Sequence, residues 1–174
     1  RNIVTVKLLQ KIGTSSVIKM ARNLGIKSRM ENNLSIGLGS SGVTLQELVS
    51  AYSAFANHGI KVESKGIRYV ENRNGKVLFK ESQNKTQPIS NGIASVITSL
   101  LQSVVKEGTA KKVRALERPT AGKTGTTNNY IDAWFLGYTP KLLTGVWEGK
   151  DDVEPLGKNE TGSRAALPIW LEYM

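Results

Sequence analysis

The chain has 174 residues, enough for one domain with a hydrophobic core, and 39% of them are hydrophobic. It has no cysteine, which excludes a disulfide framework and a cysteine metal site. Its single histidine, His58, argues against a histidine metal cluster. The net charge of +10 suits an anionic surface, but the longest basic run is Lys111-Lys112 and no nucleic-acid-binding signature occurs. We therefore expect no metal, no cofactor and no nucleic-acid partner.

The helical part is expected to cover about residues 1–59. Apolar spacing over residues 2–12 predicts a helix that ends at Gly13, and the spacing over residues 15–24 predicts a second one that ends at Gly25. No apolar run reaches the roughly 18 residues that a membrane helix needs. The chain begins without Met and enters directly into apolar spacing, so it is expected to be part of something longer.

Two local signals organise the middle of the chain. Thr44 followed by Glu47 is the pattern of a capping box, so a third helix is expected to begin there, with His58 in the turn that ends it. Residues 66–81 alternate around the turn Asn72–Gly75, which predicts a β-hairpin.

A long helix is predicted over about residues 90–107, closed by Gly108, because its apolar residues recur at helical spacing. This stripe should pack on a sheet, with Val96 and Leu100 buried. Its members are Ile93, Val96, Ile97, Leu100, Leu101, Val104 and Val105.

The sheet is expected within about residues 121–148. Strand-like segments cover residues 121–127, 131–138 and 142–148, and a final amphipathic helix covers about 164–174. Helices, then strands, then a covering helix predict an α+β fold with an antiparallel β-sheet flanked by helices.

The triplet Gly122-Lys123-Thr124 raises the question of a phosphate loop. Such a loop needs glycine at position 117, where the chain has Glu117, and a helix after the lysine instead of a strand. A second glycine pattern, GLGSSG at 37–42, lacks the preceding strand and the βαβ unit of a dinucleotide site. We interpret it as a loop before the third helix.

In a strand, by contrast, these residues form a carboxylate site. Thr124 and Thr126 would share one face because side chains alternate, and Gly125 between them would admit a ligand backbone. Two hydroxyls beside the Lys123 ammonium suit a carboxylate, and a backbone N–H on the strand edge can donate to an oxyanion.

The surrounding sequence makes this signal specific. The stretch PTAGKTGTTNNYIDAWFLGYTPKLLTGVW (119–147) resembles the third-motif region of penicillin-binding transpeptidase domains, above all the class A bifunctional peptidoglycan synthases. Residues 34–59 and 165–174 are similar to other segments of the same domain. The resemblance covers essentially residues 1–174 and implies the C-terminal part of one domain with the penicillin-binding protein/β-lactamase-like fold, incomplete at its N-terminal side.

The family works with Ser-x-x-Lys, Ser-x-Asn and Lys-Thr-Gly motifs. Lys123-Thr124-Gly125 matches the third, and register identifies Asn2 as the last residue of the second. The resemblance implies that the nucleophilic serine of the first motif lies outside this chain. Three internal Ser-x-x-Lys matches fall after Asn2, out of the family's order, and are interpreted as chance matches; they begin at Ser16, Ser82 and Ser103.

The implied activity is serine acyl transfer on D-alanyl-D-alanine stem peptides, with β-lactams acylating the same serine. By resemblance, Lys123 would supply positive potential, and Thr124, Gly125, Thr126 and Thr127 would line the carboxylate subsite. The Thr126 N–H would be an oxyanion donor, and Asn2 would contact the peptide amide.

The resemblance also implies a place at the extracytoplasmic face of the bacterial cytoplasmic membrane, held by an anchor absent from this sequence. Its partners would be stem peptides, β-lactams and the N-terminal part of the same protein. Without the first motif, this chain alone should be inactive and should not be labelled by a β-lactam. The alternative is a non-catalytic β-lactam sensor or scaffold of the same fold.

Overall fold

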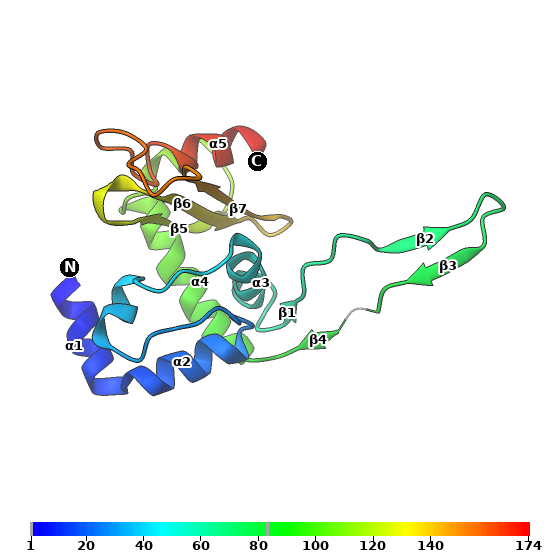
Figure 1. Cartoon of the computed structure of the whole chain (residues 1–174), viewed down its shortest axis with the longest axis horizontal. Coiled ribbons are helices and arrows are strands. Elements are labelled where there is room, and N and C mark those ends of the chain that lie inside the picture. Colours follow the sequence, from blue (N-terminus) through cyan, green and yellow to red (C-terminus); the bar gives the residue numbers. More distant parts are fainter. Residues whose placement is uncertain (1, 83) are drawn as a thin grey trace.

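The computed structural model describes residues 2–82 and 84–174, which form a layered α+β structure around one sheet (Figure 1). Three antiparallel strands lie in the order β5-β6-β7. One face is covered by α5 and the opposite face by α3 and α4. The bounds are β5 Ala121–Thr126, β6 Ala133–Tyr138, β7 Leu143–Glu148, α3 Leu45–Ala56, α4 Asn91–Lys106 and α5 Ala166–Tyr173. The predicted fold class is confirmed.

The register of the sheet determines which site residues share a face. Thr124 pairs with Phe135, whose ring packs on Trp170 of α5 with centroids 4.9 Å apart. Thr126, two residues further along β5, lies on the same face, as predicted from the alternation. Lys123 lies on the other face, which α3 and α4 cover.

The N-terminal helices follow the predicted boundaries closely. They are α1 Asn2–Ile12, α2 Thr14–Asn23 and the 3₁₀ turn η1 Leu34–Leu38. Gly13 adopts a φ of +82°, which suits glycine at the sharp corner between α1 and α2. The GLGSSG stretch begins in the last two residues of η1 and continues as the interpreted loop before α3. Thr44 and Glu47 make both hydrogen bonds of the capping box. His58 lies in the turn after α3 with a φ of +52°.

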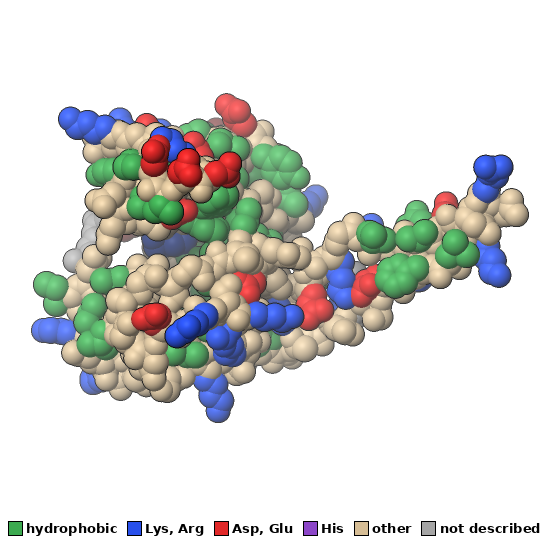
Figure 2. All heavy atoms as spheres, in the orientation of Figure 1, with side chains coloured by type: hydrophobic (Ala, Val, Ile, Leu, Met, Phe, Trp, Pro, Cys, Tyr) green, Lys and Arg blue, Asp and Glu red, His purple; other side chains and the backbone are tan. Residues whose placement is uncertain are grey.

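The predicted hairpin is a two-stranded arm that projects away from the body (Figure 1). Its strands are β2 Tyr69–Glu71 and β3 Val77–Lys80. A second pair at its base, β1 Lys61–Val62 with β4 Lys85–Thr86, was not predicted from the sequence. Apolar side chains are conspicuous along the arm (Figure 2), because a two-stranded ribbon has no layer to bury them.

The predicted orientation of the long helix α4 is wrong in one respect. Its bounds agree with the prediction and it contacts β5, with Ser90 as an N-cap that was not predicted, but Val96 and Leu100 are 61% and 59% exposed. The helix is turned so that Ala94 and Val105 are the buried positions. The described parts of the chain cover only this side of α4, so the rest of its apolar stripe, which includes Val96 and Leu100, stays exposed.

The main core lies between the sheet and α5. Leu167 and Trp170 of α5 are fully buried against Phe135, and the 3₁₀ turn η2 Lys111–Leu116 adds Val113. A further short turn, η3 Asn128–Tyr130, joins β5 to β6. Among the helices of the described residues, none combines the length and apolarity required to cross a bilayer.

Candidate active site

The first of the predicted site residues, Lys123, extends from the middle of β5. The residue as a whole is exposed, but its ammonium is partly covered by surrounding atoms and donates a hydrogen bond to the carbonyl oxygen of Thr124 at 2.6 Å. Burial of the ammonium by surrounding atoms lowers its pKa below the ordinary 10.5. Lys123 thus offers a partly desolvated positive charge with N–H groups still available to a ligand.

Thr124 lies on the opposite face of the strand from Lys123 and is only 9% exposed. Its hydroxyl shares a hydrogen bond with the hydroxyl of Thr109, 2.6 Å between the two Oγ1 atoms. Thr109 comes from the segment between α4 and η2, so the motif residue is contacted by a loop that precedes the strand.

Gly125 and Thr126 are contacted by the loop before α5. The Thr126 hydroxyl accepts a hydrogen bond from the backbone N–H of Gly162 at 3.0 Å. A Cβ on Gly125 would lie 3.0 Å from the Cβ of Trp134 on the neighbouring strand. Glycine at this position therefore lets β5 and β6 approach each other beside the tryptophan.

Thr127 closes the turn that follows β5. Its Oγ1 accepts a hydrogen bond from the backbone N–H of Asp132 at 2.7 Å, and its own N–H donates to the Asp132 carbonyl at 3.1 Å. The Asp132 carboxylate in turn accepts from the Trp147 indole N–H at 2.8 Å. Through Asp132, these bonds link the end of β5 to Trp147 of β7.

Asn2 is the first described residue of α1 and is exposed. Helix α1 packs on η1 and α2, in the layer of helices below the sheet layer in the view of Figure 1. The space-filling view is hollowed between these two layers (Figure 2). Asn2 and the β5 residues therefore belong to different layers, and their side chains make no hydrogen bond to each other within residues 2–82 and 84–174.

The three Ser-x-x-Lys matches that we interpret as chance lie in different segments, and Gln83 in the second match lies outside the described residues. Ser16 is in α2 and Ser82 is in the loop after the arm. Ser103 donates back to the Ser99 carbonyl within α4 at 3.2 Å, as serines in helices often do.

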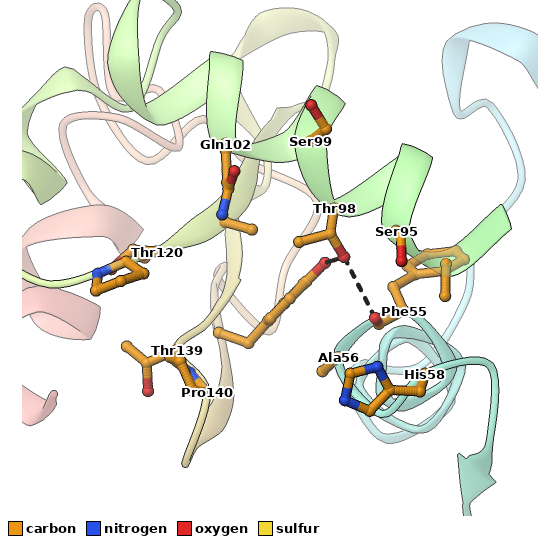
Figure 3. A pocket seen from close by; sticks show the side chains of 14 residues that line it. Phe55, Ala56, His58, Ser95, Thr98, Ser99, Gln102, Thr120, Thr139 and Pro140 are labelled. Carbon is orange, nitrogen blue, oxygen red and sulfur yellow. Dashed lines mark hydrogen bonds between the residues drawn. The ribbon is translucent and has the colours of Figure 1, made fainter. Parts of the chain in front are cut away.

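A pocket of about 320 Å³ opens at the beginning of β5, beyond the motif (Figure 3). The ends of α3 and β6 and one side of α4 line it, and none of the predicted site residues does. Thr98 bridges its wall through a 2.8 Å hydrogen bond to the Tyr138 hydroxyl and a 3.3 Å bond to the Phe55 carbonyl. Burial raises the Tyr138 pKa, so this is a bond between neutral hydroxyls.

With this geometry established, comparison with known proteins identifies the domain. Residues 1–147 match the family model of the penicillin binding protein transpeptidase domain. The chain belongs to the penicillin-binding protein transpeptidase domain family. It is 39% identical over 173 residues to penicillin-binding protein 1A of Aquifex aeolicus, covering 99% of this chain and 24% of that protein.

Solved transpeptidase structures share the fold. The crystal structure of penicillin-binding protein 1A from Haemophilus influenzae superposes with a TM-score of 0.92 at 26% identity, covering 100% of this chain and 32% of that one. The PonA1 protein from Mycobacterium tuberculosis, solved in complex with penicillin V, gives 0.80 at 29% identity over 95% of this chain and 50% of that one. The chain therefore spans well under two thirds of the proteins that it matches.

At the candidate site, sequence reasoning predicted the β5 residues but did not predict their hydrogen-bond partners. Thr109, Asp132 and Gly162 contact Thr124, Thr127 and Thr126, respectively. Gly108-Thr109 directly after the long helix was a usable signal, because a glycine that ends a helix often begins a tight turn. Nothing in the local pattern pointed to Asp132 or Gly162, since their contacts cross between separate segments.

Proposed function

We propose that this chain forms one wall of the active site of a peptidoglycan D,D-transpeptidase. A serine attacks the penultimate carbonyl of a D-alanyl-D-alanine stem peptide, and D-alanine leaves with a proton as the acyl-enzyme forms. An amine of a neighbouring strand then takes the acyl group and frees the serine. β-Lactams acylate the same serine, and the resulting acyl-enzyme is hydrolysed slowly.

One observation carries this proposal: the Lys123-Thr124-Gly125 triplet lies on a strand with a free edge. Within residues 2–82 and 84–174, β5 pairs with β6 alone, so its other edge has no strand partner. An extended peptide can add to such an edge through main-chain hydrogen bonds. The Lys123 ammonium beside that edge attracts the terminal carboxylate of the peptide.

The other roles follow from the family resemblance. Thr124 and Thr126 bind the carboxylate, Gly125 and Thr127 line the same subsite, and the Thr126 N–H donates to the oxyanion. Asn2 contacts the peptide amide. The nucleophilic serine and its lysine belong to the family's first motif, which lies in a part of the longer protein outside residues 1–174. The longer protein acts at the outer face of the cytoplasmic membrane.

The test uses the full protein and penicillin V as the acylating agent. Lys123→Ala should lower the acylation rate constant about tenfold to a hundredfold, because a hydrogen bond to a charged group contributes roughly 1.5–3 kcal/mol. Lys150→Ala, which removes an exposed lysine paired with Glu154, is the matched control and should acylate normally. An unchanged rate in Lys123→Ala would contradict the assignment of β5.

Two further measurements separate the alternatives. Release of D-alanine from a stem peptide supports a transpeptidase or carboxypeptidase, whereas acylation without release indicates a sensor of the same fold. Peptide mapping of the penicilloyl adduct should place it outside residues 2–174. An adduct on Ser16 or Ser103 would show that the nucleophile was wrongly placed.

A further inference from the structure

Thr109 is a hydroxyl held directly against the motif, although it belongs to none of the three family motifs. Its Oγ1 lies 2.6 Å from the Oγ1 of Thr124, and Thr109 is exposed while Thr124 is nearly buried. Within the described part of the chain, neither hydroxyl has another side-chain hydrogen bond. The two threonines therefore form an isolated pair that opens to solvent on the Thr109 side.

The backbone on both sides of Thr109 is fixed, so the contact does not come from a freely moving surface side chain. The N–H groups of Gly108 and Ala110 both donate to the Val104 carbonyl at the end of α4, at 3.0 and 3.2 Å. Ala110 is fully buried in the main core. A Cβ on Gly108 would lie 2.8 Å from the Val104 backbone, so only glycine permits this close turn.

Proton accounting shows what the pair can do. A threonine hydroxyl has one proton to donate and two lone pairs. When Thr109 donates to Thr124, the Thr124 proton stays available for an anion. When Thr109 is absent, the nearly buried Thr124 hydroxyl loses its partner and can rotate toward any nearby acceptor.

We propose that Thr109 is a positioning residue of the carboxylate subsite. It donates to Thr124 and thereby aims the Thr124 O–H at the carboxylate of the bound ligand. This inference rests on the proposed function, because it assumes that β5 binds a carboxylate; it adds a residue that determines how strongly the carboxylate is held.

The experiment measures penicillin V acylation of the full protein, resolved into the dissociation constant of the initial complex and the acylation step. Thr109→Val removes the hydroxyl at nearly constant shape and should weaken the initial complex about threefold to tenfold, the range of one net hydrogen bond. Thr109→Ser retains the hydroxyl and should recover to within about twofold. Thr120→Val removes a buried hydroxyl that donates to the Arg118 carbonyl and serves as the matched control.

The penicillin V methyl ester, which lacks the carboxylate, isolates the proposed role. The dissociation constants of the initial complex in wild type and Thr109→Val should differ much less with the methyl ester than with penicillin V itself. Equal losses in Thr109→Val and Thr109→Ser, or an equal loss on acid and ester, would show a structural role and overturn the inference. Should Thr109→Val fail to fold, Thr109→Ala and Thr109→Ser provide the same comparison.

Failure of this inference is distinct from failure of the proposed function. If Lys123→Ala is impaired while Thr109→Val acylates as wild type does, the active site stands and the positioning role is wrong. If the wild-type protein is not acylated at all, the proposed function itself fails, and the inference fails with it.

Discussion

The backbone N–H of Gly162 donates a hydrogen bond to the side chain of Thr126 at 3.0 Å, which ties the loop before α5 to the site strand. The approach is close because Gly162 has no side chain. A Cβ there would lie 2.3 Å from the carbonyl oxygen of Trp134 and 2.4 Å from that of Gly125. The loop, β5 and β6 therefore form one tightly packed unit at the Thr126 end of the site.

Gly162→Ala should accordingly displace the loop and destabilise the protein by about 1–3 kcal/mol, the usual cost of overpacking. Thermal or denaturant unfolding measures this loss. Gly42→Ala is the matched control, because no atom lies within 4 Å of a Cβ at that position. Equal stability of the two variants would show that the loop yields without cost.

Lys123→Met should separate stability from activity. Burial lowers the Lys123 pKa below its ordinary value, so the charged form costs stability at neutral pH and this cost fades as pH rises toward 10.5. Methionine keeps much of the apolar stem without the charge. The variant should unfold at the same or a higher temperature than wild type, while penicillin acylation falls about tenfold to a hundredfold. A clear loss of stability would contradict the desolvation argument.

Glu47 should make the stability of the helical part depend on acid pH. Partial burial disfavours its charge, but four hydrogen bonds outweigh this and lower its pKa from 4.5 to about 2. The donors are the Ser28 hydroxyl and the backbone N–H groups of Lys27, Ser28 and Thr44. A lowered folded-state pKa contributes stability that is complete above pH 4.5 and is lost as pH falls toward 2.

Glu47→Gln should therefore be less stable than wild type at pH 7. The difference in unfolding free energy between the two should shrink as pH falls from 4.5 toward 2. Denaturant unfolding at several pH values measures it. Glu172→Gln, which changes an exposed carboxylate on α5, is measured in parallel as the control. A constant difference between Glu47→Gln and wild type across the pH range would mean that the ionised carboxylate is not the stabilising group.

The projecting arm and the core should respond differently to the same substitution. Leu78 on β3 is 63% exposed, whereas Leu167 on α5 is 0% exposed. Leu167→Ala should cost about 2–5 kcal/mol through lost burial and a cavity. Leu78→Ala should change unfolding free energy by no more than about 0.5 kcal/mol. A large loss in Leu78→Ala would show that the arm packs against the body in solution.

Local signals in the sequence were sufficient for the main helices, the arm hairpin and the three-stranded sheet, but not for the β1–β4 pair. Some features depend only on residues close together in the sequence, so the local sequence predicts their geometry. Examples are Gly13, the capping box at Thr44 and the turn Asn72–Gly75. Alternation along β5 likewise determined that Thr124 and Thr126 share a face. The assignment of Asn2 and Lys123-Thr124-Gly125 to family motifs came from the resemblance and its register.

Only the tertiary structure decided which sector of α4 is covered and which groups meet the motif. The apolar stripe of α4 is broad. Periodicity therefore identifies the stripe but does not indicate which part of it is buried, and the structure shows that this is the side of Ala94 and Val105. The Thr109–Thr124 and Gly162–Thr126 contacts join segments separated by 15 and 36 residues. Such contacts depend on how layers pack against each other, and packing is determined by shape and volume across the whole core rather than by neighbouring residues.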